Sequence, residues 1–323
     1  MQDGYNKVRD RDDRDRKLDV PNVAMITFFT TGKPFIGHNG VIQRNALKSW
    51  TLAAPGAEVI LFGNEEGAAE TARELGIRHV AEVERRPEGP KVLRSFFDEA
   101  QRIARYETLC YVNCDIILMH DFATAVEKVV AGNKEFLLVG RRWDTDVTEP
   151  IAFEGTAWRE QLREKAHARA AQCSGDWIDY FAFRKGFYLG KLPEFVIGRV
   201  FWDQWLVWKA QEAGAMVVDA SQAVLAIHQN HDYGYHPAGK AGVWSDALSQ
   251  RNYALAGGRW HLRTIDDASH LLDVDGLKPN PDRRQRATAR FLKTAKDAVW
   301  ITALDWTRPL RSALGLRKKS GTG

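Results

Sequence analysis

The sequence is poor in cysteine, with only Cys110, Cys114 and Cys173 among 323 residues. Three scattered thiols cannot form the paired framework of a small secreted domain, and their spacing does not match the CxxC pairs of zinc sites. Disulfide scaffolds and cysteine-based zinc modules are therefore excluded as classes. We expect a protein of a reducing compartment.

Long hydrophobic runs are also missing. No apolar stretch approaches the roughly 18 residues of a membrane span, and the first 19 residues hold six acidic and six basic side chains where a signal peptide would be apolar. A segment so rich in charge buries too little apolar surface to offset the entropy of ordering it. We therefore expect a cytoplasmic protein in which residues 1–20 form a disordered charged arm.

The glycine-rich loops of two common nucleotide-binding folds are absent too. The first apolar segment ends in the sequence TTGKPF over residues 30–35, which contains neither GxGxxG nor GxxxxGK[ST]. Those glycines are needed where the backbone approaches a phosphate closely. Rossmann dehydrogenases and P-loop NTPases are therefore disfavoured.

Positive charge is concentrated at the C-terminal end. Residues 281–323 hold 11 Lys and Arg against 3 Asp and Glu, so that the preceding 280 residues carry a net charge of −4 within a total of +4. A nucleic-acid-binding protein more often spreads its cations over the folded surface. No nucleic-acid partner is expected.

Apolar residues make up 44% of the chain, enough for a sizeable core. Short apolar segments alternate with amphipathic ones through the first half, and strands that are apolar on both faces belong to a parallel sheet covered by helices on both sides. The sequence predicts a single large α/β domain with a Rossmann-like, mixed and mostly parallel sheet. The predicted elements are strand 22–31, helix 41–53, strand 57–65, helix 67–76, strand 77–84, helix 92–106, strand 107–119, helix 121–132, strand 135–144, helix 202–214 and an interrupted strand 215–228.

Asp115 is the first candidate for chemistry, because the triplet Asn113-Cys114-Asp115 directly follows the apolar segment LCYV. Ligands of open α/β sheets bind beyond the carboxyl ends of the strands. A hard carboxylate in that place suits Mg²⁺ or Mn²⁺ that takes its other oxygen ligands from a substrate diphosphate. The alternative is that Asn113 and Asp115 simply form a turn.

Histidines cluster after the last predicted strand, where His228, His231 and His236 fall within nine residues. A neutral imidazole from this cluster would complete the shell of a metal held by Asp115, and His231 or His236 would reach a phosphate. The spacing is not that of a helical zinc motif. The alternative is a set of surface or core histidines without a ligand.

Asp203 stands between Trp202 and Trp205 at the start of a predicted helix. A carboxylate that two indole rings partly shield from water has a raised pKa, as a general base for a hydroxyl group requires. The rings themselves would stack on the apolar face of a sugar. The alternative is that Asp203 caps the helix or interacts with its dipole.

Further polar side chains follow predicted strands and so face the same crevice. We expect these to bind the nucleobase, ribose or phosphates of a nucleotide: Thr30, Thr31, Lys33, Asn64 and Arg141. Asp179, between Ile178 and Tyr180, is a candidate for orienting an acceptor hydroxyl. A structural hydrogen bond is the alternative role for Asp179.

The chain has a β/α half first, an acidic motif at the end of an apolar strand and a second half after it, and with these motifs it resembles the GT-A nucleotide-sugar glycosyltransferases over about residues 22–260. The resemblance implies a GT-A-like fold and a nucleotide-diphosphate sugar donor bound by residues 21–145, with the acceptor and catalytic half at 146–280. It places Asp115 and His228 on the divalent metal and Asp203 as the base of an inverting transfer. Asn113 stands where the family usually has its first acid. If Asp203 is only a cap, a retaining mechanism stays open.

The segment 281–323 is expected to be a basic amphipathic helical tail. Such a helix can lie on an anionic membrane, at the inner face here, which suits a lipid-linked or glycan acceptor. The alternative is a helix docked on the body or mediating a dimer. Two other functions stay open: a non-catalytic nucleotide-sugar-binding or membrane-associated scaffold, and a nucleotidyltransferase, whose expected glycine-rich loop with an arginine the sequence TTGKPFIGHNG matches poorly.

Overall fold

The structure is a computed structural model that describes residues 25–132, 134–168, 172–232 and 239–296. The predicted arm at residues 1–20 lies outside the described residues, as does the tail beyond residue 296. None of the helices within the described part of the chain is long and apolar enough to cross a bilayer.

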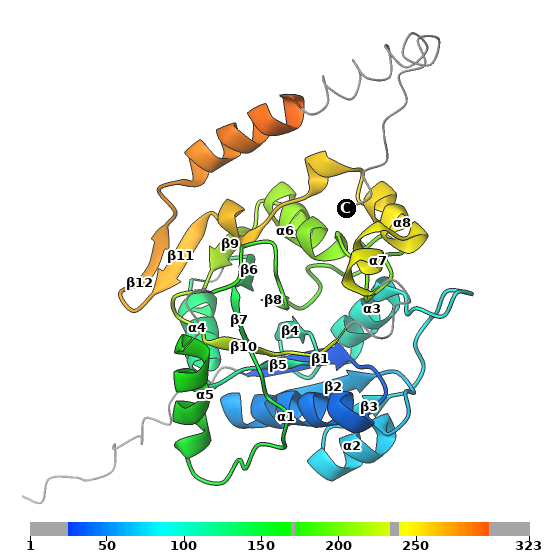
Figure 1. The fold of residues 1–323 in the computed structure, drawn as a ribbon. Coiled ribbons are helices and arrows are strands. Elements are labelled where there is room, and N and C mark those ends of the chain that lie inside the picture. The colour runs from blue at the N-terminus through cyan, green and yellow to red at the C-terminus, as the bar shows by residue number, and fades with distance from the viewer. Residues whose placement is uncertain (1–24, 133, 169–171, 233–238, 297–323) are drawn as a thin grey trace, which may run out of the picture.

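A nine-stranded sheet runs through the centre of the described chain (Figure 1). Its strands are β1 (Ile26–Thr31), β2 (Glu58–Phe62), β3 (Arg78–Val80), β4 (Thr108–Val112), β6 (Phe136–Val139), β8 (Tyr180–Arg184), β9 (Met216–Asp219), β11 (His270–Asp273) and β12 (Gly276–Pro279). They lie in the order β12-β11-β9-β6-β8-β4-β1-β2-β3. Only β8 and β12 run antiparallel to their neighbours in this sheet. The predicted α/β class with a mixed, mostly parallel sheet is confirmed.

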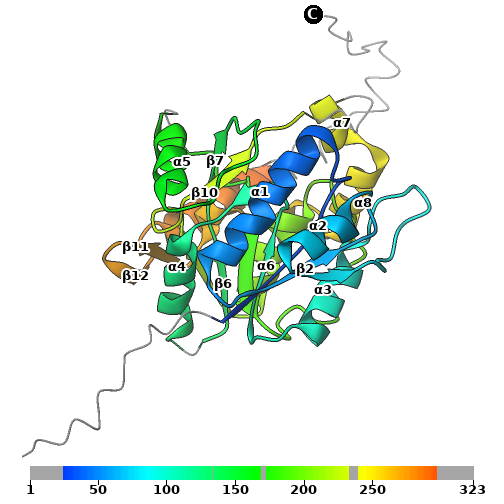
Figure 2. The same ribbon diagram turned by 90° about the horizontal axis from the view of Figure 1, so that it is seen from below.

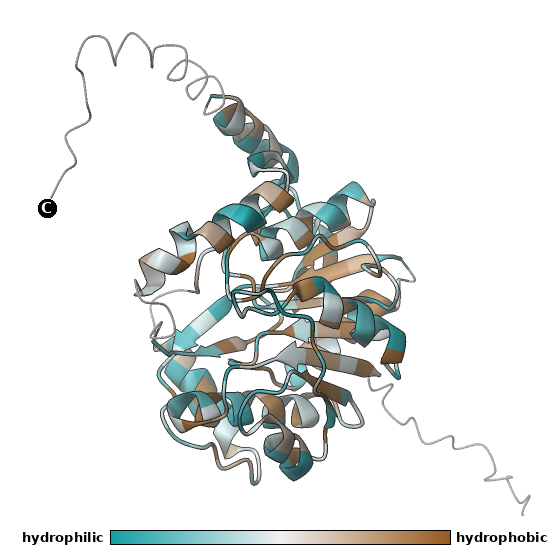
Figure 3. Ribbon diagram, turned by 90° about the vertical axis from the view of Figure 1, so that its right-hand side faces the viewer, coloured by the Kyte–Doolittle hydropathy of each residue, from teal (hydrophilic) through white to brown (hydrophobic). Residues whose placement is uncertain are grey.

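Helices cover both faces of this sheet, because successive strand residues point to opposite sides. Phe28 packs with α1, α2 and α4, whereas its neighbour Phe29 packs with α3 and α6 on the other face. Figure 2 shows α1 and α4 in front of the strands, and in Figure 3 the strands are largely brown, the colour of apolar residues. The helices are α1 (Gly37–Ala53), α2 (Ala68–Leu75), α3 (Leu93–Ile103), α4 (His120–Val130), α5 (Ala157–His167), α6 (Trp202–Glu212), α7 (Gly239–Ser245) and α8 (Ala247–Leu255), with two short 3₁₀ helices, η1 (Arg259–His261) and η2 (Ile265–Asp267).

A second sheet of three short strands stands beside the large one. It has the order β5-β10-β7, from β5 (Ile116–Ile117), β10 (Ala226–Gln229) and β7 (Arg142–Thr145), and α5 packs on it. The prediction of one strand over residues 107–119 is therefore wrong. The chain turns at Asn113, whose carbonyl accepts from the N–H of Ile116 at 3.1 Å, and continues in the other sheet.

Strand β8 was not predicted, and it fills the centre of the large sheet between β4 and β6. Its first four residues, from Tyr180 to Phe183, are buried. Strand β8 is inserted into the sheet begun by the first half of the chain, and β9, β11 and β12 extend it. Both halves therefore build one sheet, and the loops at its edge come from both.

Candidate active site

A cavity of about 560 Å³ lies where β1 and β4 end, within the volume range typical of small-molecule sites, roughly 300–1,000 Å³. Thr31 and Lys33 line it from the end of β1, and Asn113 and Asp115 line it from the turn after β4. Residues from the second half of the chain complete the wall. The cavity thus occupies the position where open α/β sheets bind ligands.

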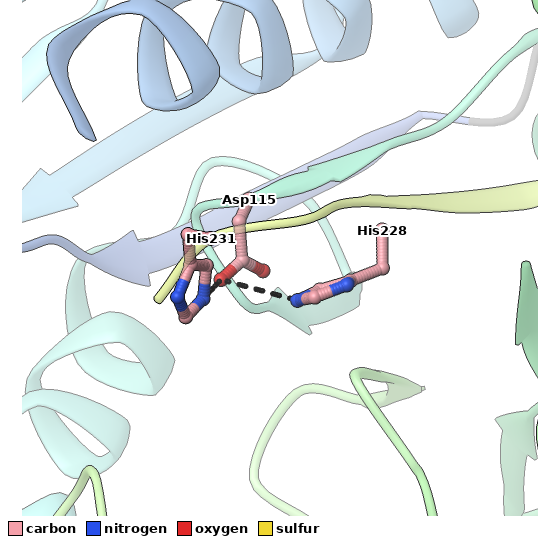
Figure 4. A group of neighbouring side chains, drawn as sticks. All are labelled: Asp115, His228 and His231. Atoms are coloured by element: carbon pink, nitrogen blue, oxygen red, sulfur yellow. Dashed lines mark hydrogen bonds and ion pairs between the residues drawn. The ribbon is translucent and has the colours of Figure 1, made fainter. Parts of the chain in front are cut away.

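Asp115, His228 and His231 form a cluster in this cavity, with one potential ligand atom from each within 4.8 Å of the others. The Nε2 atoms of His231 and His228 lie 3.2 Å and 3.9 Å from Oδ2 of Asp115. In Figure 4 both dashed lines end on this one oxygen. The other oxygen, Oδ1, is buried and has no hydrogen-bond partner among the described residues.

The backbone brings these side chains together, although they are far apart in sequence. Strand β10 runs antiparallel to β5, with His228 opposite Ile116. The N–H of Gln229 donates to the carbonyl of Asp115 at 3.1 Å. The turn after β4 is thereby fixed to the strand that carries His228, and His231 follows in the next loop.

Charge at the cluster favours an ionised Asp115. Burial alone would raise the pKa of this carboxyl, but the contact with His231 and the charges of His228 and Lys33 hold the pKa well below its usual range. Lys33 is itself shielded from water, and burial lowers the pKa of its ammonium group. Its Nζ lies 3.4 Å from both ring nitrogens of His231.

The cluster fits a divalent cation. A carboxylate with an unpartnered oxygen and two imidazoles is a donor set of the kind that divalent first-row metals take, with the remaining positions left to substrate oxygens or water. The sequence predicted Asp115 and His228 for this role. His231, which it assigned to a phosphate, joins them as a third potential ligand.

Asn113 and Asp179 also line the cavity, and hydrogen bonds hold both in its wall. The Asn113 amide donates to Asp179 Oδ1 at 2.6 Å and accepts from the Tyr111 hydroxyl at 2.8 Å. Asp179 Oδ2 accepts from Arg142 at 2.7 Å. Asn113 stands where the GT-A family usually has its first metal-binding acid, and here its amide orients Asp179.

Asp203 lies in the same cavity, as the second residue of α6. Phe201 is the N-cap residue, with an unusual left-handed backbone (φ 83°), so Asp203 is not the cap. Its Oδ1 is buried without a hydrogen-bond partner among the described residues. Burial raises the pKa of Asp203 to about 7. The hydrogen bond from the Gln204 backbone lowers this pKa, and the negative charge of Asp179 raises it.

The two tryptophans beside Asp203 have different places. Trp202 lines the cavity, edge-on to Tyr111 with ring centres 5.5 Å apart. Trp205 lies outside the cavity lining and packs in the core against Phe195 and Trp208. The expectation that Trp205 contacts a substrate is therefore corrected: the inner face of α6 buries this indole.

Trp177 and Trp244 line the cavity and were not singled out in the sequence. Their rings meet at 6.1 Å, and the Arg142 guanidinium lies 4.6 Å from the centre of the Trp177 ring. Trp177 stands in the turn SGDWIDY that also holds Asp179, which was the available signal. Nothing in the local sequence around Trp244 pointed to the cavity.

The last two residues of β1, Thr30 and Thr31, have different surroundings: one lies in the core and the other lines the cavity. Thr31 lines the cavity, and its hydroxyl donates to the carbonyl of Phe62 at 2.8 Å. Thr30 is fully buried outside the lining, and its hydroxyl donates to the carbonyl of Val112 at 2.6 Å. The structure thus keeps Thr31 and Lys33 as ligand-facing candidates and removes Thr30.

Two other expected nucleotide contacts lie outside the cavity. Asn64 is exposed and accepts from Arg85 at 3.3 Å, whereas the next residue, Glu65, lines the cavity and pairs with Lys91 at 2.5 Å. Arg141 points away from the cavity, where it pairs with two carboxylates, Asp219 and Asp266.

No protein-family model matches the sequence, and no curated protein is significantly similar to it. Among solved structures, the chain is similar to glucosyl-3-phosphoglycerate synthase from Mycobacterium tuberculosis in complex with Mg²⁺ and uridine diphosphate, with 13% identity, a TM-score of 0.43, and coverage of 73% of this chain and 80% of that one. It is also similar to a mannosyltransferase from Pyrobaculum calidifontis in complex with GDP-Man and Mn²⁺, with 14% identity, a TM-score of 0.43, and coverage of 65% and 58%. The similarity of the chain to these proteins is one of fold.

Proposed function

We propose that this protein is a GT-A glycosyltransferase that moves a sugar from a nucleotide-diphosphate donor to an acceptor hydroxyl. One observation carries the proposal: a carboxylate with two imidazoles around it, Asp115 with His228 and His231, shares a cavity with Asp203, a carboxyl of raised pKa. Sugar transfer needs both parts, because negative charge grows on the leaving diphosphate while the acceptor hydroxyl loses a proton.

The donor would bind at the ends of β1 and β4. Asp115, His228 and His231 would hold Mn²⁺ or Mg²⁺, which when bound offsets the charge of the leaving diphosphate. Lys33, close to His231, adds a positive charge at the same place. Thr31, Lys33 and Glu65 are the residues we assign to the nucleotide.

Asp203 would accept the proton from the acceptor hydroxyl as that oxygen attacks the anomeric carbon, which predicts inversion. A pKa of about 7 leaves a substantial ionised fraction at neutral pH and makes the carboxylate a better base than an exposed one. Trp177 and Trp244 offer indole faces on which a sugar ring can stack, and Trp202, which is buried against Tyr111, forms part of the wall beside them. The proposed acceptor is a glycan or a lipid-linked sugar.

The testing experiment combines binding and turnover. The chain is mixed with UDP-, GDP-, CMP- and dTDP-sugars, with and without Mn²⁺, and its melting temperature is measured. We expect one donor to stabilise the chain only with Mn²⁺. Donors that stabilise Asp203→Asn as they do the wild type, without transfer in either protein, would support a non-catalytic scaffold. Release of pyrophosphate from a separate mixture of a nucleoside triphosphate and a sugar 1-phosphate would support a nucleotidyltransferase.

We also propose that the C-terminal tail contacts an anionic membrane surface. Residues 283–296 are helical (Figure 1), and Phe291 and Leu292 in this helix are 60% and 61% exposed. Arg286 pairs with Asp266 on the body at 2.9 Å, and the Phe291 ring lies 5.9 Å from the ring of Trp260. These contacts support the docked alternative for the described part of the helix. Phe291→Glu with Leu292→Glu in the full chain should abolish sedimentation with phosphatidylglycerol vesicles, and a wild type that stays in the supernatant would refute the proposal.

A further inference from the structure

Arg142 is a buried cation at the border of the cavity, with 6% of its surface exposed. Its Nε lies 2.9 Å from Asp144 Oδ1, and another of its nitrogens donates to Asp179 at 2.7 Å. The planar guanidinium can hold two carboxylates in a fixed relative orientation, which a lysine ammonium cannot. Arg142 therefore fixes where the Asp144 carboxylate lies.

Asp144 in turn faces His228. Strand β10 runs parallel to β7, with His228 opposite Asp144 in the register, so the two side chains leave neighbouring strands on the same side. Nδ1 of His228 lies 3.1 Å from Asp144 Oδ1, an ion-pair distance at which the present ring orientation makes no hydrogen bond, and Nε2 of the same ring is the atom on the side of Asp115. The imidazole thus stands between two carboxylates, one at each ring nitrogen.

This arrangement favours one form of the imidazole. A proton on Nδ1 lies beside the Asp144 carboxylate, to which a small rotation of the ring lets it donate, and Nε2 then presents its lone pair toward Asp115. Histidines that bind metals in proteins usually donate their other N–H to a carboxylate or carbonyl, which fixes both the tautomer and the ring orientation. Asp144 does not line the cavity, so it acts on a ligand only through His228.

We propose that Asp144, held in place by Arg142, is a positioning residue that fixes His228 for binding a divalent cation together with Asp115 and His231. The inference rests on the proposed function in one respect, the presence of a cation at this cluster. It adds two residues, Asp144 and Arg142, to those that determine how tightly the cation is held.

The test measures binding of Mn²⁺ alone to the full chain by the electron paramagnetic resonance signal of free Mn²⁺. Asp144→Asn keeps the size of the side chain and removes its charge, so we expect the dissociation constant for Mn²⁺ to rise by about tenfold or more. Asp219→Asn is the matched control, because Asp219 also pairs with an arginine, Arg141, but outside the cavity. We expect this control to bind Mn²⁺ as the wild type does.

A second readout follows the tautomer. Nitrogen-15 NMR of the histidine side chains should show His228 protonated at Nδ1 in the wild type and a mixture of tautomers in Asp144→Asn. Mn²⁺ affinity and His228 tautomer unchanged in a folded Asp144→Asn would overturn the inference and leave the proposed function standing. A wild type that binds no Mn²⁺ alone would overturn the inference, whereas the proposed function is tested separately by the stabilisation that a donor gives together with Mn²⁺. Melting curves of each variant separate loss of binding from loss of fold.

Discussion

Nε2 of His231 lies 3.2 Å from Oδ2 of Asp115, across 116 positions of the chain. The two residues meet because the turn after β4 leads into β5, and β5 pairs with β10, the strand that precedes His231. The site therefore depends on the small sheet as much as on the large one. Substitutions in the cluster should act on ligand binding, and substitutions in the strands that carry it should act on stability.

Asp115→Asn should abolish the stabilisation that Mn²⁺ and a donor together give the chain. It should also lower the transfer rate on the order of 100-fold or more, which is the effect of removing one group that stabilises transition-state charge. The reason is that the carboxylate is the one anionic ligand of the cluster. Melting curves and a transfer assay measure the two effects. A variant that keeps the Mn²⁺-dependent stabilisation would show that Asp115 does not bind the cation.

Asp203→Asn should keep donor binding and lose transfer by about 10²- to 10⁴-fold, the usual contribution of a general base. In the wild type, kcat/KM should rise with pH through about 7, because the base acts in its ionised form. A pH–rate profile of both proteins checks this. If Asp203→Asn turned over at the wild-type rate, Asp203 would be a structural residue of α6.

Asp203 should also give stability a characteristic pH dependence. Its pKa is about 7 in the folded chain and about 4 in an unfolded one, so the folded state binds the proton more tightly. The free energy of unfolding then falls as pH rises from about 4 through 7. Asp203→Asn, which cannot ionise, should be more stable than the wild type at pH 8, by up to a few kcal/mol at about 1.4 kcal/mol per pKa unit.

Urea denaturation of both proteins at pH 5 and pH 8 measures this difference. The advantage of Asp203→Asn should shrink toward pH 5, where the folded wild type is protonated at this site. An equal difference at the two pH values would mean that the carboxyl does not titrate between them.

Trp205→Ala should act on folding. Because Trp205 is buried against Phe195 and Trp208, we expect the free energy of unfolding to fall by about 3–5 kcal/mol. Trp177→Ala is the matched comparison: Trp177 lines the cavity, so its loss should raise KM for the acceptor with a smaller effect on stability. Equal destabilisation by the two substitutions would contradict this division.

The position of the site could be predicted from the sequence because the site lies where predicted strands end. Carboxyl ends of parallel strands meet at one edge, so Asp115 after one apolar segment and His228 at the end of another could be expected to lie near each other. The α/β class followed from the same alternation of apolar and amphipathic segments. Where the fold depends on a long-range pairing, as for β8 in the middle of the large sheet, local sequence offered no such signal.

Errors in the expected contacts arose mostly between neighbours. Successive side chains of a strand point to opposite faces, so if one residue faces the cavity, the next one points away from it. Thr30 and Thr31 differ in this way, and so do Arg141 and Arg142, of which the second faces the site. The phase of each strand is set by its packing against helices from elsewhere in the chain, which residue types alone did not reveal.

The central claim is that Asp115, His228 and His231 hold a divalent cation against a nucleotide diphosphate. The most direct measurement is an anomalous difference map from crystals of the protein grown with Mn²⁺ and soaked with UDP or GDP. We expect one Mn²⁺ peak within bonding distance of all three side chains, beside diphosphate density in the cavity. Diphosphate bound in the cavity with no Mn²⁺ at these residues, or Mn²⁺ bound elsewhere, would contradict it.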